Sequence, residues 1–159
     1  MDLKGILKKE LIFFSNLSKK KDKLEALIRL IDNENLVEDA EVLRQSIFSR
    51  EEIMSTGIGL GIAVPHARIK GVKNILIAIG INKNGIEDYE SIDGTPVRLV
   101  IMIIAGEKQH KDYLKLLSQV VKILKKNSRT HHLLDARNAD EVIRLLSTDF
   151  NNNHSENPT

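Results

Sequence analysis

IAVPHARIKGVKNILIAIGINKNGIEDYESIDGTPVRLVIMIIA, which spans residues 62–105, contains three strand-like segments. These segments cover residues 62–64, 75–81 and 99–105. The last two are almost continuously apolar, as strands are when a sheet is buried on both faces. Turn signals at Asn84-Gly85 and Asp93-Gly94 separate these two segments. The stretch therefore predicts the strands of a central sheet.

Helical patterns flank this stretch on both sides. Apolar residues from Leu24 to Ile31 have the spacing of one helix face, and Asp22 with Glu25 forms an N-terminal capping pattern. A capping box at Ser49 and Glu52 predicts a separate short helical turn. The other predicted helices cover residues 38–48, 110–126, 128–135 and 139–147, the last capped by Asn138 with Glu141. This order predicts an α/β fold with a mixed β-sheet flanked by helices on both faces.

Composition indicates one globular domain. The chain has 159 residues, of which 42% are hydrophobic and 29% are charged. We assign residues 1–148 to the domain and predict that the polar tail, 149–159, is disordered. The net charge of +2 does not indicate a nucleic-acid partner. Apolar runs are far shorter than the ~20 residues that span a bilayer. No signal peptide is recognisable, so we predict a cytoplasmic protein without direct membrane insertion.

Cysteine is absent, which excludes disulfides, thiolate metal sites and cysteine nucleophiles. His131 and Asp135 share a predicted helix face, but two such ligands without a third are poor evidence for a metal. We therefore predict no metal site. Any nucleophilic chemistry must use another kind of side chain.

The run STGIGLGIAVPH, residues 55–66, is the most informative motif. Its three alternating glycines allow close backbone approaches and could cradle a phosphate, but they match neither a P-loop nor a dinucleotide fingerprint. His66 directly follows a short apolar strand, and Pro65 restrains the backbone before it. If that strand is parallel to its neighbours, His66 lies at the carboxyl end where ligands gather, and its neutral imidazole could accept a phosphoryl group. The alternative is a structural histidine at a strand end.

Two further residues are candidates for holding a phosphate. His110 begins the predicted helix 110–126, in a row with Leu114 and Leu117 that should point inward at the edge of the sheet. Free N–H groups at that helix start would favour an anion. Arg50 could form two hydrogen bonds to a phosphate. The alternatives are a polar residue at a helix start for His110 and a solvated charge for Arg50.

The motif at residues 55–66 closely resembles the active-site signature of type 2 enzyme IIA domains of the bacterial phosphoenolpyruvate-dependent sugar phosphotransferase system. This family includes the fructose, mannitol and nitrogen-regulatory IIA proteins. The resemblance continues in FSRE at 48–51, YESIDGTPV at 89–97 and YLKLLS at 113–118. It implies a mixed sheet flanked by helices and a phosphohistidine intermediate on His66. The phosphoryl group would come from the phosphocarrier protein HPr and pass to an enzyme IIB, without a cofactor.

The resemblance also implies roles for other residues. Arg50 matches the family's active-site arginine, and Ser55 and Thr56 begin the loop that approaches the phosphate. Many members have a second active-site histidine where this chain has Tyr113. We predict that His110, one helical turn earlier, takes its place.

Three functions remain open at this point. The first is a IIA subunit that relays phosphate in sugar uptake. The second is a regulatory module, similar to the nitrogen type, whose phosphorylation state controls its binding to protein partners. The third is a domain that has lost phosphotransfer, for which Tyr113 is the reason. Candidate contacts for HPr and enzyme IIB are the apolar residues Ile58, Leu60 and Ile69, unless they belong to the core.

Overall fold

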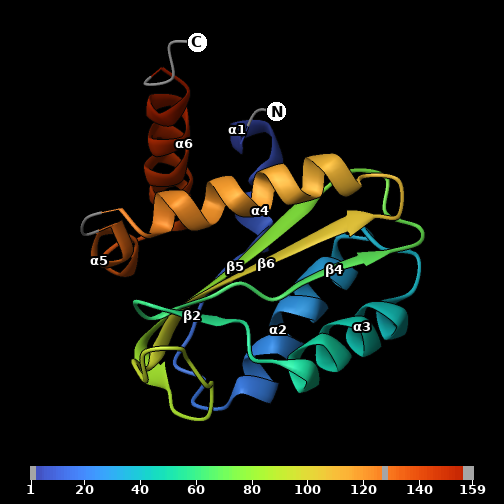
Figure 1. The fold of residues 1–159 in the computed structure, drawn as a ribbon, viewed down its shortest axis with the longest axis horizontal. Coiled ribbons are helices and arrows are strands. Elements are labelled where there is room, and N and C mark those ends of the chain that lie inside the picture. The colour runs from blue at the N-terminus through green and yellow to red at the C-terminus, as the bar shows by residue number, and fades with distance from the viewer. Residues whose placement is uncertain (1–2, 127–128, 156–159) are drawn as a thin grey trace.

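The computed structural model describes residues 3–126 and 129–155, which form a central sheet between two layers of helices (Figure 1). The strands are β1 Ile12–Phe14, β2 Gly57–Gly59, β3 Ile62–Ala63, β4 His66–Ile69, β5 Leu76–Ile86 and β6 Val97–Gly106. The helices are α1 Leu3–Ile6, α2 Lys20–Asn33, α3 Ala40–Ile53, α4 His110–Leu124, α5 Arg129–Leu134 and α6 Ala139–Ser155, with a short 3-10 helix, η1, at Lys9–Leu11.

The sheet is mixed, as predicted. Its strand order is β1-β5-β6-β3-β2, and β4 also pairs with β6. The long strands β5 and β6 form an antiparallel pair at the centre. β1 is parallel to β5, and both β3 and β4 are parallel to β6. Because β3 and β4 pair with the same side of β6, they form one interrupted strand, with residues 64 and 65 between them.

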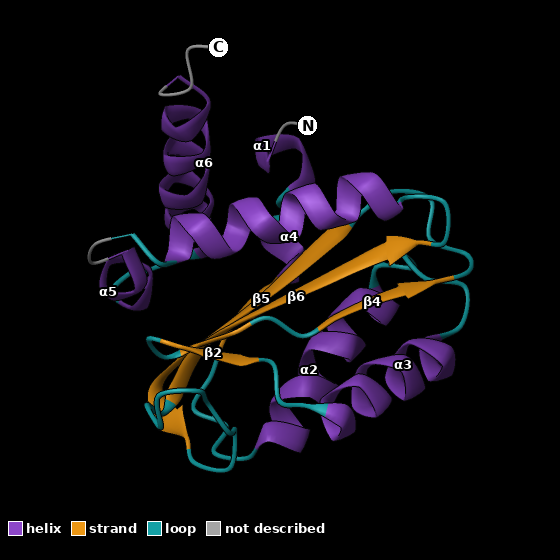
Figure 2. Cartoon of the chain, viewed as in Figure 1, coloured by secondary structure: helices purple, strands orange, loops and turns teal. Residues whose placement is uncertain are grey.

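Alternate side chains of the central strands pack into two hydrophobic cores, which confirms the prediction of helices on both faces (Figure 2). Ile77 and Ile79 of β5 pack with buried side chains of α4, α5 and α6. Leu76 and Ala78 point to the other face and pack with α2 and α3. Both faces are apolar, which explains the continuous hydrophobic runs of these strands.

Helix α3 differs from its prediction, because it continues without a break to Ile53. The capping box predicted at Ser49 and Glu52 is therefore wrong. Asp39 caps the helix instead, since its carboxylate accepts hydrogen bonds from the N–H groups of residues 41 and 42. The buried positions Leu43, Ile47 and Glu51 lie four residues apart. This spacing keeps one face of the helix against the sheet beyond the point where the apolar pattern stops.

The start of α2 also differs from the predicted cap at Asp22. The helix begins at Lys20, and no side chain of the preceding residue caps it. Asp88, far away in the sequence, accepts a hydrogen bond of 2.7 Å from the backbone N–H of Lys20. Local sequence could not indicate this cap, because its acceptor comes from another loop.

At the carboxyl end, Asn138 accepts a hydrogen bond of 2.9 Å from the N–H of Glu141, which confirms the predicted cap of α6. The helix continues to Ser155 and so extends into the segment predicted as a tail. Residues 156–159 lie outside the described residues, and the domain boundary at 148 stays a prediction. Within the described ranges, none of the helices combines the length and apolarity needed to cross a membrane.

Candidate functional site

His66 lies at the break between β3 and β4. It is the first residue of β4 and pairs with Ile103 of β6, so it sits part of the way along the sheet edge and not beyond the end of the strands. The predicted placement at a carboxyl end is correct for β3 alone. Ala67 and Ile69 pack into the core on the α2 and α3 side. Because side chains alternate along a strand, the half-buried His66 points to the opposite face, toward α4.

The ring of His66 has a defined tautomer. Its Nδ1 atom lies 2.7 Å from the carbonyl oxygen of Val64. A carbonyl oxygen only accepts hydrogen bonds, so Nδ1 carries the proton and Nε2 keeps its lone pair. The Val64 backbone is itself held, since its N–H donates to the carbonyl of Thr56 at 3.0 Å. The geometry therefore presents Nε2 as a nucleophile or a proton acceptor.

The surroundings of His66 favour the neutral imidazole. Burial lowers the pKa of His66 below its ordinary value, and the charge of Arg50 lowers it further. The hydrogen bond to Val64 and the charge of Glu51 oppose this shift. Because the net shift is downward, the ring is neutral at pH 7.

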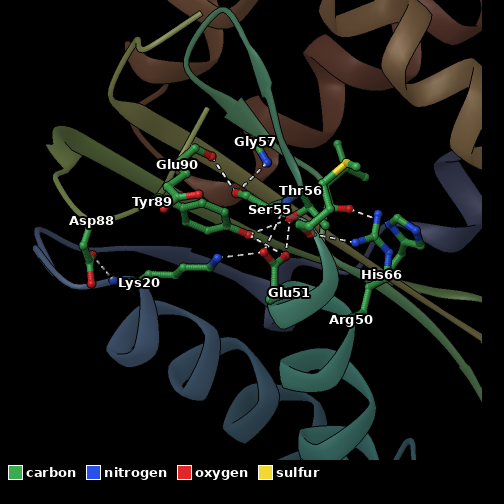
Figure 3. Close-up of polar contacts among 12 residues, drawn as sticks. Lys20, Arg50, Glu51, Ser55, Thr56, Gly57, His66, Asp88, Tyr89 and Glu90 are labelled. Carbon is green, nitrogen blue, oxygen red and sulfur yellow. Dashed lines mark hydrogen bonds and ion pairs between the residues drawn. The ribbon is translucent and has the colours of Figure 1, made fainter. Parts of the chain in front are cut away.

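Arg50 lies in the last turn of α3, and its guanidinium is next to the His66 ring (Figure 3). One of its terminal nitrogens donates a hydrogen bond of 2.7 Å to the carbonyl of Met54, the residue after the helix. This bond fixes the planar guanidinium, whose other N–H groups can bind an anion. The structure thus brings Arg50 and His66 together, as predicted.

A buried polar cluster holds the loop that follows α3. Both oxygens of the Glu51 carboxylate accept hydrogen bonds from Thr56, one from the side chain and one, at 3.2 Å, from the backbone N–H. The Tyr89 hydroxyl also donates to Glu51, at 3.1 Å, and Lys20 pairs with it at 2.8 Å (Figure 3). The Lys20 ammonium further lies 4.5 Å from the centre of the Tyr89 ring.

This cluster was missed by sequence reasoning, apart from Thr56. Its members come from α2, α3 and two loops, so no local spacing joins them. The signal that was present is Glu51 itself, a charged residue that continues the buried face of α3. Burial and the charge of Glu51 raise the pKa of Tyr89 well above its usual range, so its phenol stays protonated and donates to the carboxylate.

Ser55 connects the same loop to the segment after β5. Its hydroxyl donates to the carbonyl of Glu90 at 2.5 Å and accepts a hydrogen bond of 3.3 Å from the N–H of Gly57. The two backbones are so close that a Cβ atom on Gly57 would lie 2.2 Å from the Glu90 oxygen. The side chains of Ser55 and Thr56 thus hold the loop in place next to His66.

The remaining glycines of the motif form the turn between β2 and β3. Gly59, Leu60 and Gly61 all have positive φ angles, of 93°, 59° and 77°. Asp93 accepts a hydrogen bond of 2.9 Å from the N–H of Leu60 and another of 3.0 Å from the N–H of Thr95. These two bonds hold the pKa of Asp93 well below its usual range. The carboxylate of Asp93 thus occupies this turn and binds the N–H group of Leu60.

On α4, the inward position belongs to Tyr113 and not to His110. His110 is exposed, and Leu114 of the predicted inward row is 49% exposed. The buried face instead contains Tyr113, Leu116, Val120, Ile123 and Leu124. The predicted row of His110 and Leu114 is therefore wrong, because the large ring of Tyr113 fills the space next to His66. The role predicted for His110 in phosphotransfer stays a prediction.

A depression of about 570 Å³ opens in front of His66 and Arg50. Its wall includes three strongly exposed apolar side chains, Ile53 at 81%, Met54 at 68% and Ile92 at 83%. Ile58 also lines the depression, whereas Ile69 is buried in the core and cannot contact a partner. Exposed apolar residues around a polar centre are typical of a protein-binding surface. Within the described residues, no three His, Asp or Glu side chains gather to hold a metal ion.

Comparison with known proteins finds a family model, relatives and solved structures that match this chain. The family model described as phosphoenolpyruvate-dependent sugar phosphotransferase system, EIIA 2, matches residues 5–149. The fructose-specific EIIABC component of this system from Bacillus subtilis is 35% identical over 148 residues. The match covers 92% of this chain but 23% of that relative, so the chain spans less than a quarter of the relative's length.

Two solved structures have the same fold. The nitrogen regulatory protein IIA-Ntr from Neisseria meningitidis has a TM-score of 0.84 and 27% identity, over 91% of this chain and 98% of that one. The Escherichia coli enzyme IIAMTL, in its complex with phosphorylated enzyme IIBMTL, has a TM-score of 0.73 and 24% identity, over 89% and 97% of the two chains. The second likeness shows the fold alone.

Proposed function

Because the chain belongs to the EIIA 2 family of the phosphoenolpyruvate-dependent sugar phosphotransferase system, we propose that it is a phosphocarrier with a phosphohistidine intermediate on His66. Phospho-HPr donates the phosphoryl group, and an enzyme IIB accepts it in sugar uptake. The observation that carries the proposal is the hydrogen bond of 2.7 Å between Nδ1 of His66 and the Val64 carbonyl. It leaves the lone pair on Nε2, next to a fixed guanidinium.

The transfer needs no proton movement on this chain. The lone pair of His66 Nε2 attacks phosphorus, the Nε2–P bond forms, and the N–P bond of the donor breaks. The electron pair of the broken bond returns to the donor imidazole. The phosphorylated His66 ring then carries a positive charge, because Nδ1 keeps its proton, and the Val64 carbonyl stabilises that charge. The second transfer repeats the same displacement toward an acceptor side chain of enzyme IIB.

Phosphoryl transfer depends mainly on alignment and on stabilisation of negative charge on the phosphoryl oxygens. Arg50 supplies positive charge next to Nε2, and its bond to Met54 holds the guanidinium in place. The Glu51 cluster acts indirectly, since it fixes Thr56, whose carbonyl in turn holds Val64. In this scheme, Glu51 and Thr56 position the nucleophile, and Arg50 and His66 touch the phosphoryl group.

The surface around the depression supports protein partners. A donor must place its phosphorus in line with Nε2, and the exposed side chains of Ile53, Met54 and Ile92 offer an apolar rim on which such a protein can dock. An E. coli IIA protein of the same fold has been solved in complex with a phosphorylated enzyme IIB. Docking of HPr and of enzyme IIB here, and a cytoplasmic location, are parts of the proposal.

A regulatory role is the second candidate, and a specific observation favours it. The nitrogen regulatory IIA-Ntr of Neisseria meningitidis is more similar in structure to this chain, with a TM-score of 0.84, than the Escherichia coli IIAMTL, with a TM-score of 0.73. In this role the same phosphohistidine would change which proteins bind to the rim. Both roles require phosphate on His66 and differ only in the fate of that phosphate.

The test begins with the chain, phosphoenolpyruvate, enzyme I and HPr. We expect intact-mass analysis to show the addition of one acid-labile phosphoryl group, and we expect peptide mapping to place it on His66. His66→Ala should take up no phosphate, whereas the control His132→Ala, at an exposed histidine of α5, should be phosphorylated like the wild type. A folded wild type that stays unmodified beside a working IIA protein would refute the proposal.

A second experiment separates the two roles. The phosphorylated chain is offered to purified enzyme IIB with membranes and a panel of sugars. Sugar phosphorylation would establish the role in uptake. A chain that is phosphorylated by HPr but passes phosphate to none of the sugars would support the regulatory role.

A further inference from the structure

Tyr113 makes an unusual approach to the candidate nucleophile. Its ring packs against the His66 ring, with 5.9 Å between the ring centres and an angle of 52° between the planes. The ring is buried, but the hydroxyl is not enclosed and has no hydrogen-bond partner among the described residues. The chain's other tyrosine, Tyr89, behaves differently, because its hydroxyl is bound by Glu51 and Thr56. The Tyr113 hydroxyl is therefore a donor left available at the site.

Arg68 is a second group near the site, and the family resemblance did not point to it. It follows His66 by two residues on β4, so both side chains point to the same face of the sheet. Arg68 is exposed, and its positive charge acts on the Tyr113 hydroxyl together with that of Arg50. The Tyr113 phenol and the Arg50 guanidinium thus lie beside His66, and Arg68 extends from the same face of β4. The buried carboxylate of Glu51 is already paired with Lys20.

We propose that the Tyr113 hydroxyl donates a hydrogen bond to an oxygen of the phosphoryl group on His66, and that Arg68 provides a second positive charge for that group beside Arg50. The proposal rests on the proposed function, because it concerns the phosphoryl group carried by Nε2. It assigns direct contacts with the reacting group to two residues, one on α4 and one on β4. The exposed His110 is not needed for these contacts.

A tyrosine at this place has a chemical consequence. Burial raises the pKa of Tyr113 to about 12, although the charges of Arg68 and Arg50 oppose the shift. The phenol therefore keeps its proton at every physiological pH and always donates. A histidine in the same place would change its charge near pH 6.5. The site thus holds phosphate with one titrating imidazole, His66 itself.

The test uses phosphoramidate, a small donor that phosphorylates histidine without a partner protein, so that docking does not affect the result. Tyr113→Phe keeps the ring contact and removes only the hydroxyl, and Arg68→Gln removes the guanidinium and its charge but keeps a polar side chain. We expect each variant to phosphorylate His66 at least about ten-fold more slowly than the wild type, since each loses a hydrogen bond or charge on the transferring group. Lys70→Gln removes an exposed charge just after β4 and should have no effect.

A second readout separates contact with phosphate from a packing role. The phosphorus NMR resonance of phospho-His66 should shift in Tyr113→Phe and in Arg68→Gln relative to the folded wild type. In concentrated urea, the resonances of all variants should coincide, because the surroundings of the phosphoryl group are then lost. A variant that only loosens packing would lower the melting temperature without moving the resonance of the folded protein.

The outcomes distinguish this inference from the proposed function. A wild type that takes no phosphate on His66 overturns both. A wild type that is phosphorylated, with both variants at the wild-type rate and resonance, overturns the roles of Tyr113 and Arg68 and leaves the phosphocarrier intact. If Tyr113→Phe does not fold, the test depends on the exposed Arg68. Slower phosphorylation of His66 in Arg68→Gln supports the phosphate site, and an unchanged rate overturns it. If Tyr113→Phe alone is slower, the role of Arg68 is wrong.

Discussion

Lys23 is a fully buried lysine of α2, and replacing it with methionine should stabilise the protein. Its ammonium donates to the Ser15 hydroxyl at 2.7 Å and lies 5.1 Å from the centre of the Phe13 ring. No acidic side chain forms an ion pair with it among the described residues. The stem lies over Gly80, where a Cβ atom would be 2.3 Å from its Cε. The charge is therefore buried without a counter-charge.

The expected size of the effect comes from the pKa. Burial lowers the pKa of Lys23 from 10.5 to about 8. Each pKa unit corresponds to about 1.4 kcal/mol, so burying the charged form costs about 3 kcal/mol at pH 7. Below pH 8 both the folded and the unfolded chain are protonated here, and this cost is fully present. Between pH 8 and 10.5 only the unfolded chain keeps the proton, so the contribution of Lys23 to stability improves as the pH rises.

Methionine removes the charge and also the hydrogen bond to Ser15, which is worth about 1 kcal/mol. We therefore expect Lys23→Met to raise the free energy of unfolding by about 2 kcal/mol at pH 7. The gain should shrink above pH 8 by about 1.4 kcal/mol per pH unit and change sign at about pH 9.5, where the remaining cost of the charge equals the value of the lost hydrogen bond. Urea denaturation followed by circular dichroism at several pH values measures this difference. Lys21→Met, at an exposed position of the same helix, is the matched control.

The reasoning is refuted if Lys23→Met is less stable than the wild type at pH 7. It is also refuted if the difference between the two proteins does not change between pH 7 and 10. Either result would mean that water or rearranged neighbours stabilise the charged lysine inside the folded protein. The Lys21→Met control measures how much the loss of one positive charge alone changes the free energy of unfolding, and this change is subtracted from that of Lys23→Met.

Three further predictions concern the site. Glu51→Gln should lower the free energy of unfolding by about 3 kcal/mol, because it removes the negative charge that pairs with Lys20 in the buried cluster. Urea denaturation with the same midpoint as the wild type would contradict this. Gly57→Ala should lower it by about 1–3 kcal/mol, because the new Cβ would lie 2.2 Å from the Glu90 oxygen, and a thermal melt measures the loss. NMR titration should show the His66 imidazole staying neutral to a lower pH than N-acetylhistidine amide, since its pKa is lowered. Equal midpoints would show that burial does not control it.

The sequence was sufficient for those parts of the fold that depend on local pattern. The apolar runs at 75–81 and 99–105 became β5 and β6, and the cap at Asn138 was read correctly. Errors occurred where a polar residue belongs to a buried face. Glu51 continues α3 and Tyr113 fills the inward row of α4, but both interrupt a hydropathy pattern. Their positions depend on partners elsewhere in the chain, which a single sequence does not show.

The candidate site divides in the same way. His66 could be chosen because its motif is local and carries a recognisable signature, and Arg50 could be added from the resemblance. Lys20 and Tyr89 could not, since they reach Glu51 from separate segments. Arg68 follows His66 by two residues in the sequence, but the sequence does not connect it with Tyr113. That connection depends on the fold, because α4 places the Tyr113 ring against His66 on the same face of β4.

The interruption between β3 and β4 connects fold and chemistry. Pro65 has no N–H group and cannot donate to the ladder of β6, although its carbonyl accepts a hydrogen bond of 3.0 Å from Ile103. The N–H of Val64 turns away from β6 and donates to Thr56, which leaves the Val64 carbonyl free to hold Nδ1 of His66. An uninterrupted strand would use such backbone groups for pairing. The break in the sheet is thus the reason that His66 has a fixed tautomer, with Nε2 available for phosphate.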